Sequence, residues 1–148
     1  MESAKSATVA RLTALVGEHD GEFAGPWWLR STGPITMWLT GMPGWCGKSF
    51  RPPTSGSDVI EGTNLVRRGD QLVASIPMNA RIAPSRVDGR TALIVHYPKD
   101  ARFPWRNVTD ELRPLDDRTL LGLSFGIPGS PPGGAPFLLR RKGRPILG

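Results

Sequence analysis

The sequence is short of cysteine, histidine and long apolar runs, and each shortage excludes a class of protein. A single cysteine, Cys46, rules out an internal disulfide and any zinc site built on several cysteines. Two histidines are too few for a histidine-rich metal site. No apolar stretch is long enough to cross a membrane, and residues 1–8 lack the apolar centre of a signal peptide. We expect a cytoplasmic protein without a metal or a membrane anchor.

Several sequence motifs of catalysis are also missing. The chain has no Walker phosphate-binding loop, no dinucleotide-binding Gly-x-Gly-x-x-Gly and no Gly-x-Ser-x-Gly nucleophile elbow. Any catalysis is therefore expected to need no cofactor.

The charge is unbalanced, with a formal net charge of +6. A basic chain raises the possibility of nucleic-acid binding. The arginines are scattered, however, and no RRM, KH or zinc-finger signature is present. We interpret the charge as a solvated basic surface and keep nucleic-acid binding as the third hypothesis. The one basic cluster is near the C-terminus: Arg140, Arg141, Lys142 and Arg144.

Glycine and proline are abundant, with 18 and 15 residues among 148. Such frequent turn residues favour many short strands over long helices. The length suits one domain spanning residues 1–148. Within it, residues 1–20 are expected to form a short helix (6–16) and a linker, and residues 141–148 a flexible tail.

Alternating apolar and polar residues predict roughly seven or eight strands. Turns are expected at Gly69-Asp70, Asp88-Gly89 and Asp116-Asp117. Because no helical stretch separates the later strands, the sheet should be antiparallel. Closure into a small up-and-down barrel would remove the exposed edges, with a sandwich as the alternative. The predicted strands are residues 35–40, 46–51, 59–68, 71–82, 91–97, 105–115, 119–127 and 135–141.

Two of these strands have a clear apolar face, which should line the interior of the barrel. In the first, Leu72, Ala74, Ile76, Met78, Ala80 and Ile82 share a face, and the outward Pro77 indicates an edge or a bulge. In the second, Leu121, Leu123, Phe125 and Ile127 share a face. Met78, Leu123 and Phe125 are therefore predicted to bind a substrate.

Three stretches resemble the GXWXG family and its companion domain of unknown function. The first is Gly25-Pro26-Trp27-Trp28 followed by Thr32-Gly33, the second runs from Trp45 to Phe50, and the third runs from Asp110 to Asp117 and ends at Gly122. Leu29 and Glu111 stand where the family has a glycine and a histidine. The resemblance implies a small lipocalin-like barrel with no settled activity. It also implies that Trp27 closes the floor of the barrel.

Asp110 is the strongest candidate for a catalytic residue. It shares a strand face with Val108 and Leu112, so it should point into the barrel. A carboxylate in an apolar cavity can act as a general acid or base. The alternative is a structural ion pair between Asp110 and an arginine. Glu111 and Arg113 lie on the opposite face, where an external cross-strand pair explains them.

Tyr97 and His96 are candidates for moving protons with Asp110. Alternation lets only one of them face inward, and the more apolar set of residues favours Tyr97. His19 is expected in a polar loop. Among the tryptophans, Trp28 and Trp38 are predicted to line the pocket, whereas Trp45 and Trp105 are expected in the core.

Three functions remain open. The first is a cofactor-independent enzyme that isomerises, cyclises or dehydrates an apolar polyketide- or terpenoid-like substrate, as in secondary metabolism. The second is a carrier or sensor of a hydrophobic ligand. The third is a nucleic-acid-binding module. A homodimer is compatible with each of them.

Overall fold

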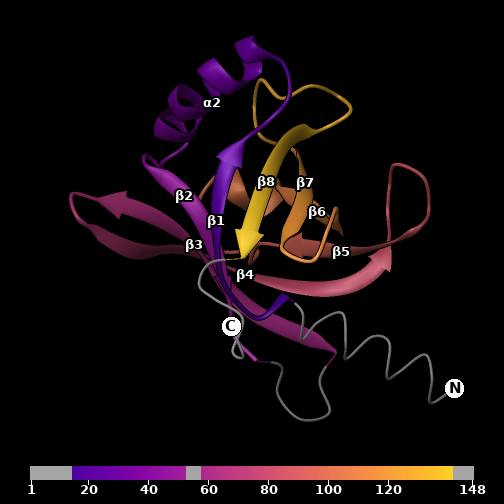
Figure 1. The fold of residues 1–148 in the computed structure, drawn as a ribbon. Helices are drawn as coiled ribbons and strands as arrows, with labels where there is room; N and C mark the ends of the chain where they lie inside the picture. Colours follow the sequence, from indigo (N-terminus) through magenta and orange to yellow (C-terminus); the bar gives the residue numbers. More distant parts are fainter. Residues whose placement is uncertain (1–14, 53–57, 142–148) are drawn as a thin grey trace, which may run out of the picture.

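The chain forms a closed antiparallel barrel with a helix across one end in this computed structural model (Figure 1). The structure describes residues 15–52 and 58–141. Each strand pairs with the next, and β8 pairs with β1 to close the ring. The expected all-β, up-and-down barrel is thus confirmed. The elements are β1 (Gly17–Phe23), α2 (Trp27–Leu39), β2 (Trp45–Phe50), β3 (Val59–Arg68), β4 (Gln71–Pro84), β5 (Thr91–His96), a 3-10 turn (Trp105–Asn107), β6 (Thr109–Pro114), β7 (Thr119–Phe125) and β8 (Ala135–Arg141).

Most of the later strands follow the predicted pattern. The bounds of β3 and β8 match the prediction, and Gly69 adopts the positive φ of 61° that its tight turn requires. The loop around Asp88-Gly89 is longer than the expected two-residue turn, because β4 ends at Pro84 and β5 begins at Thr91. This longer loop, residues 85–90, covers part of the outer face of the barrel, as described below.

A bulge in β4 divides the apolar face that alternation predicted. Thr63 pairs with Pro77 but Asn64 pairs with Ser75, so Ile76 is the extra residue, with a φ of 53°. Met78 and Ala80 face the interior as expected. Beyond the bulge the sides exchange, so Leu72 and Ala74 lie on the outer face. The suggestion of a bulge beside Pro77 is confirmed.

The predicted inward face of β7 is wrong. Ser124 pairs with the buried Asp110, and Gly122 pairs with the fully buried Leu112. Because directly paired residues point to the same side of a sheet, these positions face inward and Leu123 and Phe125 face outward. Phe125 is covered on the outside by the guanidinium of Arg86, 4.4 Å from its ring centroid. A fully apolar stripe need not face the interior when a loop covers it from outside.

The N-terminal part of the chain differs most from the prediction. β1 falls where a linker was expected, and α2 replaces the strand expected over residues 35–40. Trp27 does not close the barrel, because it lies on α2 with 72% of its surface exposed. Gly33 brings the helix close to β1, since a side-chain carbon there would lie 2.7 Å from the ring of Phe23. The helix continues through an internal Pro34.

Two further boundaries need correction. The strand expected from residue 105 begins only at Thr109, after the 3-10 turn that buries Trp105. The predicted N-terminal helix lies almost entirely outside the described residues, as does the tail apart from Arg141, which ends β8. Among the helices that the structure describes, none has the length and apolarity needed to cross a membrane.

Candidate functional site

The most unusual feature of the barrel is a charged cluster inside it. Lys48 and Asp110 are 2% and 1% exposed, and their Nζ and Oδ2 atoms lie 3.0 Å apart. The Lys48 ammonium also donates to the Tyr97 hydroxyl at 3.0 Å and to Asn64 Oδ1 at 2.8 Å. Tyr97 donates to Asp110 Oδ2 at 3.1 Å, and Ser124 donates to Asp110 Oδ1 at 2.5 Å. We call these five residues the Lys48–Asp110 network.

Four strands and one flanking residue place the network. Lys48, Asn64, Asp110 and Ser124 face inward from β2, β3, β6 and β7, and Tyr97 directly follows β5. Asn64 is held from two sides, because its Oδ1 also accepts from Trp45 Nε1 at 3.1 Å. Its Nδ2 donates to the Ile76 carbonyl at 3.2 Å, at the bulge of β4. The network thus rests on rigid barrel strands.

A small cavity adjoins the network at the end of the barrel that α2 covers. Its volume is about 50 Å³. The polar part of its wall is the Lys48–Asp110 network itself. The remainder is apolar, and Met37 of α2 and the fully buried Met42 close it from above. The other apolar lining residues include Phe23, Trp45, Trp105, Ile127 and Phe137.

The surroundings keep Lys48 charged and Tyr97 neutral. Burial by itself would lower the pKa of Lys48, but the attraction of Asp110 and the hydrogen bond with Tyr97 outweigh it and raise that pKa. Burial, together with the charge of Asp110, raises the pKa of Tyr97 to about 12. The site therefore presents an ammonium and a phenol, both hydrogen-bond donors, beside a carboxylate.

This combination can transfer protons. A carboxylate next to an apolar cavity can take a proton from a bound molecule, and fixed donors nearby can stabilise the negative charge that forms. Asp110 Oδ1 accepts only from Ser124 among the described residues, so it keeps a lone pair for a ligand. The aromatic ring of Phe137, with its centroid 5.7 Å from Lys48 Nζ, adds to the stabilisation of the ammonium.

The structure brings together three of the predicted site residues. Asp110 and Tyr97 are in direct contact inside the barrel, and Met78 lies beside them with its sulfur 3.6 Å from Lys48 Nζ. The alternative of an ion pair is also realised, with a lysine rather than an arginine as the partner of Asp110.

Sequence reasoning missed Lys48, Asn64 and Ser124. The available signal was a polar side chain on an otherwise apolar strand face. Lys48 shares a face with Phe50, and Asn64 shares a face with Ile60 and Val66. Both partners of the ion pair also lie in the stretches that resemble the GXWXG family and its companion domain. Lys48 is in the second stretch and Asp110 begins the third.

Other predicted site residues lie elsewhere. His96 is exposed on the outside of β5, where burial of its ring and the charges of Arg81 and Arg86 lower its pKa. Trp38 is 65% exposed on α2. Trp28 is half exposed and lines an adjoining pocket between α2 and the loop that follows β7. That pocket shares five lining residues with the cavity beneath α2: Phe23, Met37, Ile127, Ala135 and Pro136. Leu123 and Phe125 are on the outer face, as described above.

Glu111 was expected on the exposed surface with Arg113, but it is buried. Loop 85–90 covers it, and its carboxylate accepts from the Ser85 hydroxyl at 2.5 Å and from the Arg86 backbone at 3.0 Å. Arg113 pairs instead with Asp88 of the same loop. The two residues therefore anchor a loop.

His19 was expected in a polar loop, but it is a buried residue of β1. It faces the interior at the end of the barrel opposite α2. Across the described parts of the chain, no three His, Cys, Asp or Glu side chains come together in a way that could hold a metal ion.

Comparison with known proteins supports the fold alone. No protein-family model and no curated protein matches the chain. A crystal structure of a protein from Thermomonospora curvata is similar, with a TM-score of 0.58 and 20% sequence identity over 89% of this chain and 78% of that one. The resemblance to the GXWXG family stays a prediction.

Proposed function

We propose that the cavity beneath α2 is the active site of a cofactor-independent enzyme that rearranges an apolar small molecule by proton transfer. One observation carries the proposal: a buried lysine, aspartate and tyrosine form one wall of an otherwise apolar cavity. Stability does not require such a cluster, because apolar residues of similar size often stabilise a core as well or better. Proton transfer does require charged groups of this kind.

The proposed step is an enolisation. Asp110 Oδ1 removes a proton from the carbon next to a carbonyl group, and the electron pair moves to the carbonyl oxygen. Lys48 stabilises that oxygen as a donor, and Tyr97 does so when its hydroxyl proton turns from Asp110 Oδ2 to the substrate. Lys48 can direct one N–H to the substrate because Asn64 Oδ1 keeps its hydrogen bond from Trp45. Where a carbon–carbon double bond adjoins the deprotonated carbon, the electron pair is shared with the far end of that double bond, and return of the proton there completes an isomerisation. Cyclisation or dehydration of a polyketide- or terpenoid-like molecule can begin with the same proton removal.

Substrate entry requires the helix to move. A cavity of about 50 Å³ holds only about three water molecules. Met37 is the one buried side chain of α2, so the helix is attached to the barrel by few contacts. Displacement of Met37 and Met42 would enlarge the cavity without changing the strands that hold the network.

Deuterium exchange tests the proposal without knowledge of the natural substrate. The full chain is incubated in D₂O with a series of small cyclic ketones, and loss of the proton signal next to the carbonyl is followed by NMR. At least one ketone is expected to exchange faster with the wild type than with Asp110→Asn, whereas the surface-matched control Asp100→Asn should exchange it as fast as the wild type. Tyr97→Phe keeps the ion pair and is expected to slow exchange roughly tenfold or more.

The variants also separate catalysis from folding. Asp110→Asn leaves a buried ammonium without its counter-charge, so its fold is checked by circular dichroism. If a folded Asp110→Asn or Tyr97→Phe protein exchanges every ketone as fast as the wild type, the network is not catalytic.

A carrier of an apolar ligand is the second candidate, and the hydrogen bonding of Lys48 favours it. The three ammonium protons have three oxygen partners within the protein, so the network is complete without a substrate. Native mass spectrometry of the purified protein, with extraction of any bound compound, distinguishes the two. A stoichiometric apolar ligand that shows no exchange or turnover would establish the carrier.

A further inference from the structure

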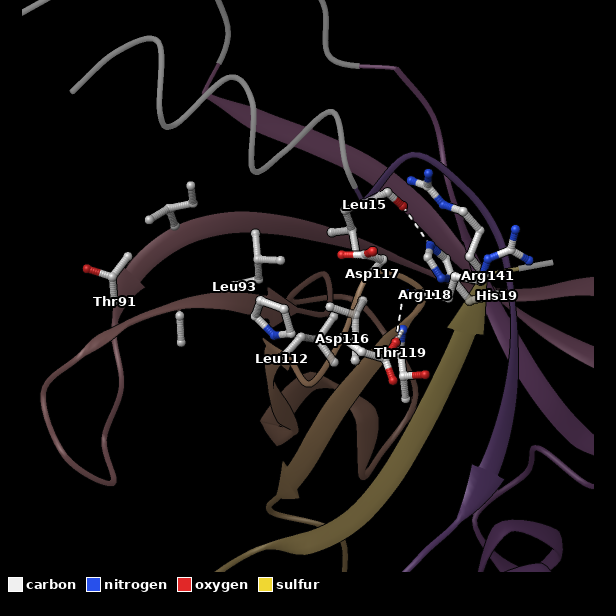
Figure 2. A pocket seen from close by; sticks show the side chains of 14 residues that line it. Leu15, His19, Thr91, Leu93, Leu112, Asp116, Asp117, Arg118, Thr119 and Arg141 are labelled. Carbon is white, nitrogen blue, oxygen red and sulfur yellow. Dashed lines mark hydrogen bonds between the residues drawn. The ribbon is translucent and has the colours of Figure 1, made fainter. Parts of the chain in front are cut away.

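A second cavity lies at the end of the barrel opposite α2 (Figure 2). Its volume is about 150 Å³, and it shares no lining residue with the cavity beneath α2. Its inner part is apolar, and its rim carries two carboxylates and two guanidinium groups, which leave no net charge. The apolar lining includes Leu15, Ile82, Leu93, Leu112 and Leu120, and the charged rim consists of Asp116, Asp117, Arg118 and Arg141.

His19 is a polar residue in the wall of this cavity, which Thr91 and Thr119 also line. It is 2% exposed, and its Nε2 lies 2.8 Å from the Leu15 carbonyl oxygen (Figure 2). A carbonyl can only accept a hydrogen bond, so Nε2 carries the proton and Nδ1 of the neutral ring has a free lone pair. Burial, reinforced by the charge of Arg141, lowers the pKa of His19 and keeps the ring neutral.

Nδ1 of His19 receives no hydrogen bond from any residue that the structure describes, although it is fully buried. An unsatisfied buried acceptor costs about 1–3 kcal/mol, and such groups are rare in folded proteins. The surrounding residues do not account for this acceptor. A bound molecule with a hydroxyl group would.

We propose that this cavity binds a compact, uncharged cyclic alcohol, of which phenol is the simplest example, whose hydroxyl donates to His19 Nδ1 once the imidazole ring turns enough to expose that atom to the cavity. The volume suits one six-membered ring, since a dry apolar cavity of about 150 Å³ accommodates benzene. The apolar lining contacts the ring, and the balanced rim gives no preference for an ion. His19 is paired with Lys48 across β1 and β2, but the two cavities share no lining residue, so the site would exist whether or not the Lys48–Asp110 network is catalytic.

Nitrogen NMR of the histidine rings tests the proposal on the full-length protein. The chain has only two histidines, so His19 and His96 can be assigned with a His96→Phe variant. Titration with phenol is expected to give a saturable shift of the His19 Nδ1 resonance and no shift of His96. Toluene has the same ring without a donor, and it is expected to bind roughly tenfold more weakly.

Two variants locate the binding. His19→Phe keeps an aromatic ring without the acceptor and should abolish the preference for phenol over toluene. Leu120→Trp fills the cavity and should abolish binding of both. Equal affinity of the wild type for phenol and toluene, or a shift of His96 alone, would overturn the proposal even if neither variant folds.

Discussion

Beneath α2 the barrel buries a lysine, an aspartate and a tyrosine that satisfy one another, whereas at the other end it buries one histidine with an acceptor left over. Both ends belong to the same set of strands, whose backbone hydrogen bonds are completed by closure of the barrel. The side chains at each end are therefore free to differ. The difference shows that a buried polar group can be balanced within the protein or, as at His19 Nδ1, have no partner among the described residues.

The comparison predicts that the network end is the more sensitive to substitution. Lys48→Met leaves the Asp110 carboxylate buried without its counter-charge and should cost about 3–5 kcal/mol of unfolding free energy. His19→Phe at the other end removes the unpaired acceptor Nδ1 and also the hydrogen bond from Nε2 to Leu15. The two losses partly cancel, so the unfolding free energy should change by less than about 1 kcal/mol. Urea unfolding followed by tryptophan fluorescence measures both.

The double variant Lys48→Met/Asp110→Asn provides the control for that experiment. It removes both charges, so it should recover much of the loss caused by Lys48→Met alone. Equal destabilisation by the lysine and histidine substitutions would remove the distinction between the two ends.

The next largest effect is expected on the unfolding free energy in alkaline solution, where Tyr97 titrates. The pKa of Tyr97 is about 12 in the folded protein but about 10 in an unfolded chain. Between these values the folded state holds more protons, so stability falls as the pH rises through that range, on the order of 2–3 kcal/mol. Tyr97→Phe should make this loss smaller in urea unfolding measured from pH 9 to 11.5. An unchanged slope would show that Tyr97 titrates normally.

The smallest effect is expected on the unfolding free energy in mild acid, where His19 titrates. Its pKa lies below the ordinary value, so the unfolded chain takes up a proton at a higher pH than the folded protein. Stability is therefore complete above about pH 6.5 and decreases as the pH falls towards the folded-state pKa. His19→Phe should reduce this slope in unfolding curves between pH 7 and 5. His96→Phe is the control, since the more exposed ring of His96 should contribute less.

Alternation of apolar and polar residues predicted the inward face correctly for some strands and not for others. Period-two alternation located Asp110 and Tyr97 correctly inside the barrel, because each strand has only two faces. Alternation could not tell which face of β7 was internal, since loop 85–90 makes an outer surface suitable for Leu123 and Phe125. Pro77 indicated an edge or a bulge, but alternation could not show that the two faces of β4 exchange at Ile76, which depends on the pairing of β3 with β4.

The sequence alone was sufficient for the all-β class, the order of the later strands and the inward carboxylate. These features are local, because they follow from alternation and turn residues within a few positions of one another. Only the tertiary structure decided that residues 27–39 form a helix, that Lys48 is the partner of Asp110, and that His19 is buried. For Lys48 and His19 the physical reason is distance along the chain, because their neighbours belong to strands that only the closed barrel brings together.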